Sequence, residues 1–263
     1  MTAAVCPVCG APLAPAFAKD FSWEDLGRVD YDRCTACGFT RSRTHAEMDD
    51  VRWTRLNAAF HEQRDAAAGR STPARWRERA DGYVAAIRAA REAGALSTAR
   101  PWLDYGAGGG HLTELIEAAT GQEILRYEPF CPGSGGTWVD AAELRPGSCD
   151  LVVNTAMFEH VRDRETLDHV AGLVSPDGAL ALHTVIVDRV PDDPEWFYLL
   201  PVHCAFFTNA AMRRLCADWG FHSSAFYRPG KMWLLFRRKF DQLPPALSGG
   251  DWLSGPGFLS PWT

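Results

Sequence analysis

The clearest hydrophobic pattern lies after residue 100, where short apolar runs alternate with amphipathic stretches. The apolar runs that have the length of buried strands are residues 101–105, 123–127, 150–154 and 179–187. The amphipathic stretches that predict helices are residues 111–120, 164–173 and 209–219. Two final strands are predicted at 221–227 and 232–237, with a Pro-Gly turn between them. Strands and helices that alternate in this way predict a doubly wound α/β sheet, finished by a hairpin.

A helical pattern precedes this domain. Glu47–Arg64 carries apolar residues at helical spacing with charges between them, and a second helix is predicted over Ala74–Ala93, before Gly94. Two roles remain open for these helices. They are a packing spacer, or they cover the carboxyl edge of the sheet as a lid.

The first 44 residues carry two cysteine pairs with the same spacing. Cys6 and Cys9 form one CxxC pair, Cys34 and Cys37 form the other, and a glycine follows each pair. Two residues between cysteines let both thiolates of a tight turn point at one tetrahedral metal ion, and the glycine permits a positive φ. The spacing therefore predicts a closed four-cysteine zinc ribbon, in which Val29–Arg33 is a strand that enters the second pair.

The zinc ion is expected to be structural, because a module this small has little core of its own. A disulfide framework is the alternative, but nothing else in the chain is typical of a secreted protein. A redox CxxC is disfavoured because one pair would suffice for that chemistry.

Composition and charge narrow the function. The chain has 263 residues, of which 46% are hydrophobic, and its longest uncharged stretches are interrupted by prolines, so we expect a cytoplasmic protein without a membrane span. Residues 101–263 carry twelve basic and twenty acidic side chains, a net charge of −8. A surface that follows phosphates needs the opposite sign, so nucleic acid is an unlikely partner. The sequence does not define the oligomeric state.

A glycine loop marks the predicted cofactor site. Gly106, Gly108 and Gly110 follow the first strand of the α/β domain and precede a helix, where a ligand can approach bare backbone. In a dinucleotide fingerprint (GxGxxG) that begins at Gly106, the third glycine would stand at position 111, where this chain has His111. Glu128 ends the next strand, where a carboxylate can accept hydrogen bonds from both ribose hydroxyls of a nucleoside.

These residues carry a resemblance to a known family. The stretch 103–110 resembles the first motif of class I S-adenosylmethionine (SAM)-dependent methyltransferases, and 150–161 and 175–180 resemble the later turns of that family. The resemblance covers residues 100–240. It implies a Rossmann-like, mostly parallel sheet of the seven-stranded type and favours SAM over NAD. The segment between Glu128 and Trp138 is too short and glycine-rich for the usual crossover helix, so the sheet is expected to be trimmed there.

The resemblance also assigns roles to cofactor-binding residues. Glu128 is at the ribose position, and Asp140 fits the contact to the adenine amine. Asp104 corresponds to an acid that holds the glycine loop or the methionine amine, and Asn154 lies in the matching fourth strand. The residues that this comparison implies for SAM are Asp104, Gly106, Gly108, Gly110, Glu128, Asp140 and Asn154.

The acceptor side is predicted from its chemistry. Methyl transfer to a hydroxyl, amine or acidic carbon is helped by a base near the carboxyl ends of the strands. Candidates are His160, together with Glu159, after the fourth strand, and Tyr198 and His203 in the aromatic stretch 196–207. Each histidine has a purely structural alternative, in which it orders its loop.

We therefore divide the chain into a zinc-ribbon module (1–44), a helical connector (45–98), a SAM-binding methyltransferase domain (99–240) and a C-terminal tail (241–263). A four-cysteine module before such a domain resembles the sugar C-methyltransferases of deoxysugar and antibiotic pathways. The expected function is SAM-dependent methylation of a small polar metabolite, such as a sugar nucleotide or natural-product intermediate. The alternatives are an RNA base methyltransferase that uses the zinc module for substrate, a SAM enzyme with other chemistry, and a zinc-containing binding module.

Overall fold

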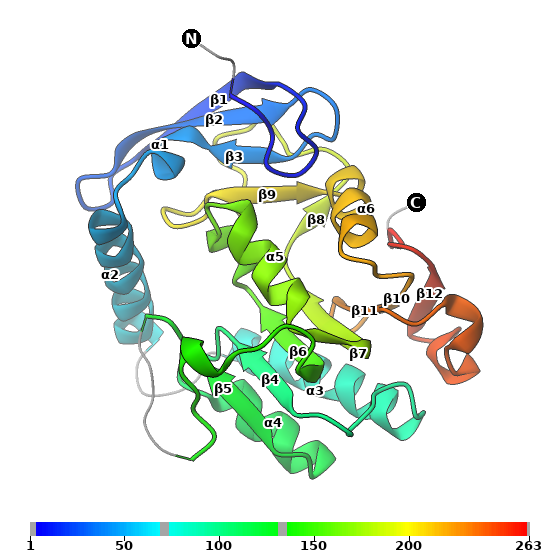
Figure 1. The fold of residues 1–263 in the computed structure, drawn as a ribbon. Helices are drawn as coiled ribbons and strands as arrows, with labels where there is room; N and C mark the ends of the chain where they lie inside the picture. The colour runs from blue at the N-terminus through cyan, green and yellow to red at the C-terminus, as the bar shows by residue number, and fades with distance from the viewer. Residues whose placement is uncertain (1–3, 69–73, 131–135, 262–263) are drawn as a thin grey trace. The chain divides into compact units, whose positions relative to one another are not determined.

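The computed structural model describes residues 4–68, 74–130 and 136–261 (Figure 1). The chain divides into two compact units, and each is composed of separate segments. Unit 1 comprises Met1–Thr72, Met157–Thr166 and Thr184–Leu215. Unit 2 comprises Pro73–Ala156, Leu167–His183 and Cys216–Thr263. The boundaries expected from the sequence follow chain order, whereas these units interleave.

Unit 1 is built on a five-stranded sheet with the strand order β1-β2-β3-β9-β8. Its strands are β1 (Leu13–Phe21), β2 (Gly27–Cys34), β3 (Thr40–Ser42), β8 (Ile186–Val187) and β9 (Ala205–Thr208). The β1–β2, β2–β3 and β3–β9 pairs are antiparallel, and β8 pairs with β9 in parallel. The cysteine-bearing ribbon and the segment after residue 184 therefore share one sheet.

Aromatic packing holds this sheet together. Tyr31 of β2 is buried, stacks on Phe17 of β1 at a ring distance of 4.8 Å, and meets Phe206 of β9 edge-on at 5.8 Å. Such contacts supply apolar burial that the ribbon strands alone would lack.

The helices of unit 1 follow β3. Ser42 accepts a hydrogen bond from the His45 backbone N–H at 3.1 Å and so caps the short helix α1 (Arg43–Ala46). Helix α2 (Asp50–Ala68) buries Trp53, Leu56 and Phe60 along one face. The short helix η2 (Phe158–His160) completes the set.

Unit 2 contains a seven-stranded sheet with the order β12-β10-β11-β7-β6-β4-β5. Its strands are β4 (Trp102–Tyr105), β5 (Ile124–Tyr127), β6 (Cys149–Thr155), β7 (Val174–His183), β10 (Ser223–Tyr227), β11 (Met232–Phe236) and β12 (Trp252–Pro256). Strands β5, β4, β6 and β7 are parallel, and β11, β10 and β12 continue the sheet in antiparallel pairs.

Helices cover both faces of this sheet, which confirms the doubly wound α/β fold. Helices α3 (Ala74–Glu92) and α4 (His111–Thr120) pack on the face that contains Trp102. Side chains alternate along a strand, so Tyr105 points to the opposite face, where its ring meets His169 of α5 (Arg164–Gly172) at 5.8 Å. The division between the units passes through α5 and through α6 (Asn209–Asp218).

The two predicted connector helices are therefore parts of different units. Helix α2 belongs to unit 1, and α3 contributes Ala86, Ile87 and Ala90, all fully buried, to the core of unit 2. For α3 this favours the packing role over a lid.

The seventh strand has an unexpected source. In the described part of the segment between β5 and β6 there is no strand, and Trp138 makes only an isolated parallel bridge to Arg126. The seventh strand is β12, which comes from the C-terminal tail and pairs with β10. Three short helices complete the unit, namely η1 (Ala141–Glu143), η3 (Phe240–Gln242) and η4 (Pro245–Leu247). None of the described helices is long and apolar enough to cross a membrane.

Candidate functional sites

The glycine loop of unit 2 connects β4 to α4 at the carboxyl edge of the parallel strands. Gly106, Gly108 and Gly110 all have positive φ angles, of 84°, 53° and 78°. The N–H groups of Gly106 and Ala107 donate to the carbonyl of Tyr127 at 2.8 and 3.0 Å. The loop is thereby fixed against the end of β5, in a conformation that side chains other than glycine rarely adopt.

The space beside Gly110 is filled by Arg126. A Cβ at Gly110 would lie 3.2 Å from the Arg126 Nε and 3.5 Å from Trp138. The Arg126 guanidinium also donates to Glu117 of α4 at 2.6 Å and to Thr137. Arg126 therefore holds α4 and the segment beside β5 in place around the glycine loop.

Glu128 reaches into the loop from the end of β5. Its Oε2 accepts the N–H of Gly108 at 2.9 Å, and its Oε1 accepts the N–H of Phe130 at 3.0 Å. An ionised carboxylate has about four lone-pair sites, so it can accept further hydrogen bonds from a ligand hydroxyl. The structure thus brings the predicted ribose-binding residue to the predicted loop.

Asp104 and Asn154 lie beneath the loop on the neighbouring strands β4 and β6. The Thr113 hydroxyl donates to the Asp104 carboxylate at 2.7 Å, and the Asn154 amide donates to the Tyr105 carbonyl at 2.8 Å. Asp104 is 2% exposed, and the Oδ1 atom of Asn154 is buried without a hydrogen-bond partner. A buried carboxylate and an unpaired amide oxygen are costly to stability, so they are expected where a ligand supplies the missing donors.

Replacing Asp104 with Asn is expected to stabilise unit 2 in a pH-dependent way. Burial raises the pKa of the Asp104 carboxyl from 3.8 to about 6, although the Thr113 hydroxyl opposes this shift. Between those values the native state binds more protons than the unfolded chain, so the free energy of unfolding falls as pH rises. Above that window the ionised carboxylate costs about 3 kcal/mol that a neutral amide does not.

Urea denaturation of wild type and Asp104→Asn at several pH values tests this. The advantage of the variant should grow from pH ~4 to pH ~6 and then level off. A difference that stays constant with pH would contradict the raised pKa. Asp177→Asn, on the surface of the same unit, is the control.

Asp140 follows the isolated bridge beside β5 and precedes η1. Its side chain is exposed, and its backbone N–H donates to Glu143 at 2.7 Å. The bridge between Arg126 and Trp138 places Asp140 two residues beyond a short stretch that runs parallel to β5. Its predicted role toward the adenine amine stays a prediction.

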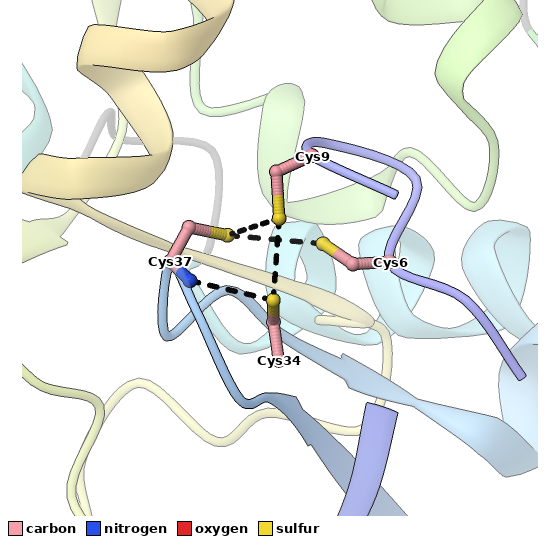
Figure 2. Close-up of side chains that lie close together, drawn as sticks. All are labelled: Cys6, Cys9, Cys34 and Cys37. Carbon is pink, nitrogen blue, oxygen red and sulfur yellow. Dashed lines mark hydrogen bonds between the residues drawn. The ribbon is translucent and has the colours of Figure 1, made fainter. Parts of the chain in front are cut away.

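The four N-terminal cysteines converge in unit 1 (Figure 2). Their sulfur atoms all lie within 4.8 Å of one another. The Sγ–Sγ distances are 3.8 Å for Cys6–Cys37, 3.4 Å for Cys9–Cys34 and 3.5 Å for Cys9–Cys37. Tetrahedral zinc with Zn–S bonds of about 2.3 Å places its sulfur ligands about 3.8 Å apart. The cysteine geometry therefore fits a zinc ion without rearrangement of the backbone.

Both cysteine pairs have the same turn geometry. Gly10 and Gly38 have φ angles of 75° and 72°, and their N–H groups donate to the carbonyls of Cys6 and Cys34 at 2.9 and 3.2 Å. Backbone N–H groups also point at the sulfurs, at 3.4 Å from Val8 to Cys6. The sequence interpretation of the glycines is thus confirmed.

Contacts from distant segments hold each cysteine turn. The Arg164 guanidinium donates to the carbonyls of Pro7 and Val8 at 3.2 and 3.1 Å, and the Thr208 hydroxyl donates to the Cys37 carbonyl at 2.5 Å. The cysteine site is therefore part of the whole of unit 1.

The predicted catalytic residues also lie in unit 1. The rings of His160 and His203 are 4.9 Å apart, and Tyr198 lies 4.5 Å from His203. Burial, helped by the negative charge of Glu159, raises the pKa of the Tyr198 phenol well above its usual value. Tyr198 therefore stays protonated at neutral pH, and its hydroxyl accepts the N–H of Val185 at 3.2 Å and lies 3.2 Å from the Thr184 hydroxyl.

Structure and sequence agree in part on the grouping of these residues. The residues predicted for SAM lie in unit 2, where Asp104, Asn154 and Glu128 surround the glycine loop, and the predicted proton-transfer residues form a group in unit 1. Asn57 of α2 and Thr184 were not predicted, although they bond to His160 and Glu159. Arg126, which packs beside Gly110, was not predicted either. Asn57 could have been found from the sequence, because it is a polar residue on the buried face of a predicted amphipathic helix.

The fold and the loop define a class of protein. A glycine loop at the carboxyl edge of a doubly wound sheet, with an acid at the end of the neighbouring strand, is typical of domains that bind a nucleoside-containing cofactor. Residues 75–223 match the family model described as a methyltransferase domain. Because this match covers more than half of the chain, the chain belongs to the methyltransferase-domain family.

Solved structures of methyltransferases are similar at low identity. An O-methyltransferase family protein from Burkholderia thailandensis is 18% identical, with 59% of this chain and 55% of that chain covered and a TM-score of 0.42. The S-adenosylmethionine-dependent methyltransferase SibL is 13% identical, with 58% and 53% covered and a TM-score of 0.39. The chain thus spans about half the length of these two proteins.

A third protein is covered over most of its length. The 1,6-didemethyltoxoflavin-N1-methyltransferase of Burkholderia thailandensis, solved with bound 1,6-didemethyltoxoflavin and S-adenosylhomocysteine, is 16% identical, with 83% of this chain and 97% of that chain covered and a TM-score of 0.44. No curated protein sequence matches the chain significantly.

Proposed function

We propose that unit 2 binds SAM and that the protein transfers its methyl group to a small polar metabolite. The observation that carries the proposal is the bond between the Glu128 carboxylate and the glycine loop, in a domain of the methyltransferase family. SAM supplies an electrophilic methyl group on its sulfonium. The task of the chain is then to bind the cofactor and to hold the acceptor in line with that methyl group.

The residues around the loop suit the two ends of SAM. Glu128 would accept hydrogen bonds from the ribose hydroxyls, which are stronger when the acceptor is ionised. The carboxylate of Asp104 and the unpaired Oδ1 of Asn154 are acceptors for a cationic amine. A positive charge near Asp104 would offset part of the cost of its buried ionisation.

The acceptor is proposed to be a small molecule such as a sugar nucleotide or a natural-product intermediate. The net charge of −8 over residues 101–263 disfavours a polyanion, and the stretch 196–207 combines aromatic and hydrogen-bonding side chains suited to a small polar compound. If the acceptor loses a proton, His160 or His203 is the proposed base. Tyr198 would donate a hydrogen bond instead.

The four cysteines are proposed to bind a structural zinc ion. Four thiolates complete a tetrahedral shell, so no coordination position remains for a substrate. The support is the convergence of the four sulfur atoms and the matching turns around them.

Calorimetric titration of the purified chain tests the cofactor proposal. We expect one molecule of S-adenosylhomocysteine to bind per chain. NAD should bind much more weakly, because His111 occupies the position of the third glycine in a dinucleotide-binding fingerprint. The absence of SAM and S-adenosylhomocysteine binding would refute the proposal. Mass spectrometry of products separates methyl transfer from other SAM chemistry.

The RNA alternative makes a distinct prediction. An RNA-binding enzyme should retain RNA at low salt and lose it steeply as salt rises. Binding of SAM without retention of RNA at low salt would favour the small-molecule acceptor.

A further inference from the structure

A second group of potential metal ligands lies in unit 1, apart from the cysteines. Glu159, His160 and His203 each place one potential ligand atom within 4.8 Å of the others. Glu159 and His203 are only 2% and 5% exposed. Two imidazoles and one carboxylate form the ligand set of many catalytic zinc sites and of other transition-metal sites that keep open positions.

The hydrogen bonds of the two histidines orient them for ligation. His203 Nδ1 donates to the Tyr198 carbonyl at 2.8 Å, and His160 Nδ1 lies 3.2 Å from Asn57 Oδ1. The Asn57 amide nitrogen donates to the Trp53 carbonyl at 2.9 Å, so its oxygen is the atom that faces His160. With the proton on Nδ1, the lone pair of each neutral ring is on Nε2. Ligating histidines commonly have this second hydrogen bond to a carbonyl or amide oxygen.

Glu159 is held in the same way. The Thr184 hydroxyl donates to Glu159 Oε2 at 2.9 Å, and the Cys204 N–H donates to the Glu159 carbonyl at 2.8 Å. The second bond joins η2 directly to the residue after His203. The three side chains are therefore brought together by backbone pairing as well as by side-chain contacts.

We propose that Glu159, His160 and His203 bind a divalent transition-metal ion of the zinc, cobalt and manganese class. Magnesium and calcium are disfavoured, because they prefer ligand sets made of oxygen alone. Three protein ligands leave at least one coordination position for water or for oxygen atoms of a small ligand. The inference goes beyond the proposed function, because an imidazole whose Nε2 binds the metal ion cannot also act as a base; the role of His160 or His203 as a base applies to the metal-free site.

Cobalt substitution distinguishes this site from the cysteine site. The full chain is produced with Co²⁺, and its bound metal and visible absorption are measured. We expect two cobalt ions per chain, one with the intense charge-transfer bands of thiolate ligation and one without them. His203→Asn keeps an N–H donor for the Tyr198 carbonyl, and Glu159→Gln keeps an acceptor for Thr184. Each should hold one cobalt ion and retain the thiolate bands, which report that unit 1 is folded.

The exposed His222, changed to Asn, is the matched control and should still bind two ions. Two results would overturn the proposal. The first is a wild-type protein that holds only the thiolate-bound ion, as expected if Glu159, His160 and His203 share a proton instead of a metal ion. The second is that both variants still hold two ions.

Manganese provides a measurement that needs no variant. Mn²⁺ prefers oxygen and nitrogen ligands to thiolates, so electron paramagnetic resonance of wild type titrated with Mn²⁺ should show one bound ion. No bound Mn²⁺ would also overturn the proposal.

Asn57 is a positioning residue, because its amide oxygen orients His160. Asn57→Ala should weaken Mn²⁺ binding about 10–100-fold, and Asn57→Asp should restore the acceptor for His160.

Discussion

Replacing Cys34 with Ser is expected to abolish zinc binding at the cysteine site and to unfold the five-stranded sheet of unit 1. Structural zinc contributes about 10–16 kcal/mol in isolated zinc-binding peptides, which is as large as the whole stability of a typical domain. Because the Cys34 carbonyl and sulfur also organise the turn at residues 34–38, little of the local structure is independent of the metal.

The effect should extend far beyond the first 44 residues. Strand β3 pairs with β9, and the Thr208 hydroxyl bonds to the Cys37 carbonyl, so loss of the ribbon removes the support of residues 205–208. His203 lies just before β9, and the groups around it should lose their order in the same transition.

Zinc content and near-ultraviolet circular dichroism of Cys34→Ser measure this result. Cys204→Ala is the matched control, because Cys204 is buried in the same unit and lies outside the cysteine cluster. The control should keep its zinc. A zinc-free Cys34→Ser protein with unchanged tertiary structure would show that the cysteines do not stabilise unit 1.

Replacing Glu128 with Ala is expected to weaken SAM binding about 10–100-fold, if two charge-assisted hydrogen bonds to the ribose are lost. Glu128→Gln should lie between wild type and Ala. The Gln amide oxygen can still accept one hydrogen bond from a backbone N–H group. Its NH₂ group cannot accept a hydrogen bond, so the bond to either Gly108 or Phe130 is lost.

Calorimetry with S-adenosylhomocysteine measures both variants. Glu123→Gln is the control, since Glu123 is exposed just before the same strand and should bind like wild type. Equal affinity of Glu128→Ala and wild type would remove Glu128 from the ribose site and leave it only the role of fixing the loop.

The parallel half of unit 2 could be predicted from the sequence because its signals are local. Helix α4 occupies His111–Thr120, as expected, since Gly110 and Gly121 end the helical pattern on both sides. Strands β4 and β6 are buried and mostly apolar, which is typical of parallel strands covered on both faces, whereas β5 at the sheet edge is fully buried only at Ile124. The cysteine cluster could also be predicted from the sequence, because each CxxC pair places two thiolates on one tight turn.

The sheet of unit 1 was harder to predict. Strand β1 is half exposed and contains Pro15, so it lacks a strong apolar pattern, and its register shifts between Pro15 and Phe17. Strand β9 was not predicted, since residues 205–207 were treated only as part of an aromatic stretch and nothing in the four residues of β9 identifies β3 as their partner. Pairing over such a distance leaves no periodic signal in the chain.

The same limit applies to the candidate sites. His160 and His203 were singled out by residue type, but Asn57, whose side chain contacts His160, comes from the distant helix α2. The trimmed sheet beside β5 was expected from the short glycine-rich segment, whereas its replacement by β12 at the opposite edge was not. Strand β12 lies in a Pro- and Gly-rich tail, where composition hides the strand pattern.

The pairing of β3 with β9 has a consequence for how the chain is made. When β1, β2 and β3 leave the ribosome, the strand that completes their sheet has not yet been synthesised. That strand ends at residue 208, after about four-fifths of the chain. Until then the exposed edge of β3 is open to pairing with other chains. Early capture of a metal ion by the four cysteines would keep the nascent ribbon ordered during this interval, so metal supply during synthesis should affect the yield of soluble protein.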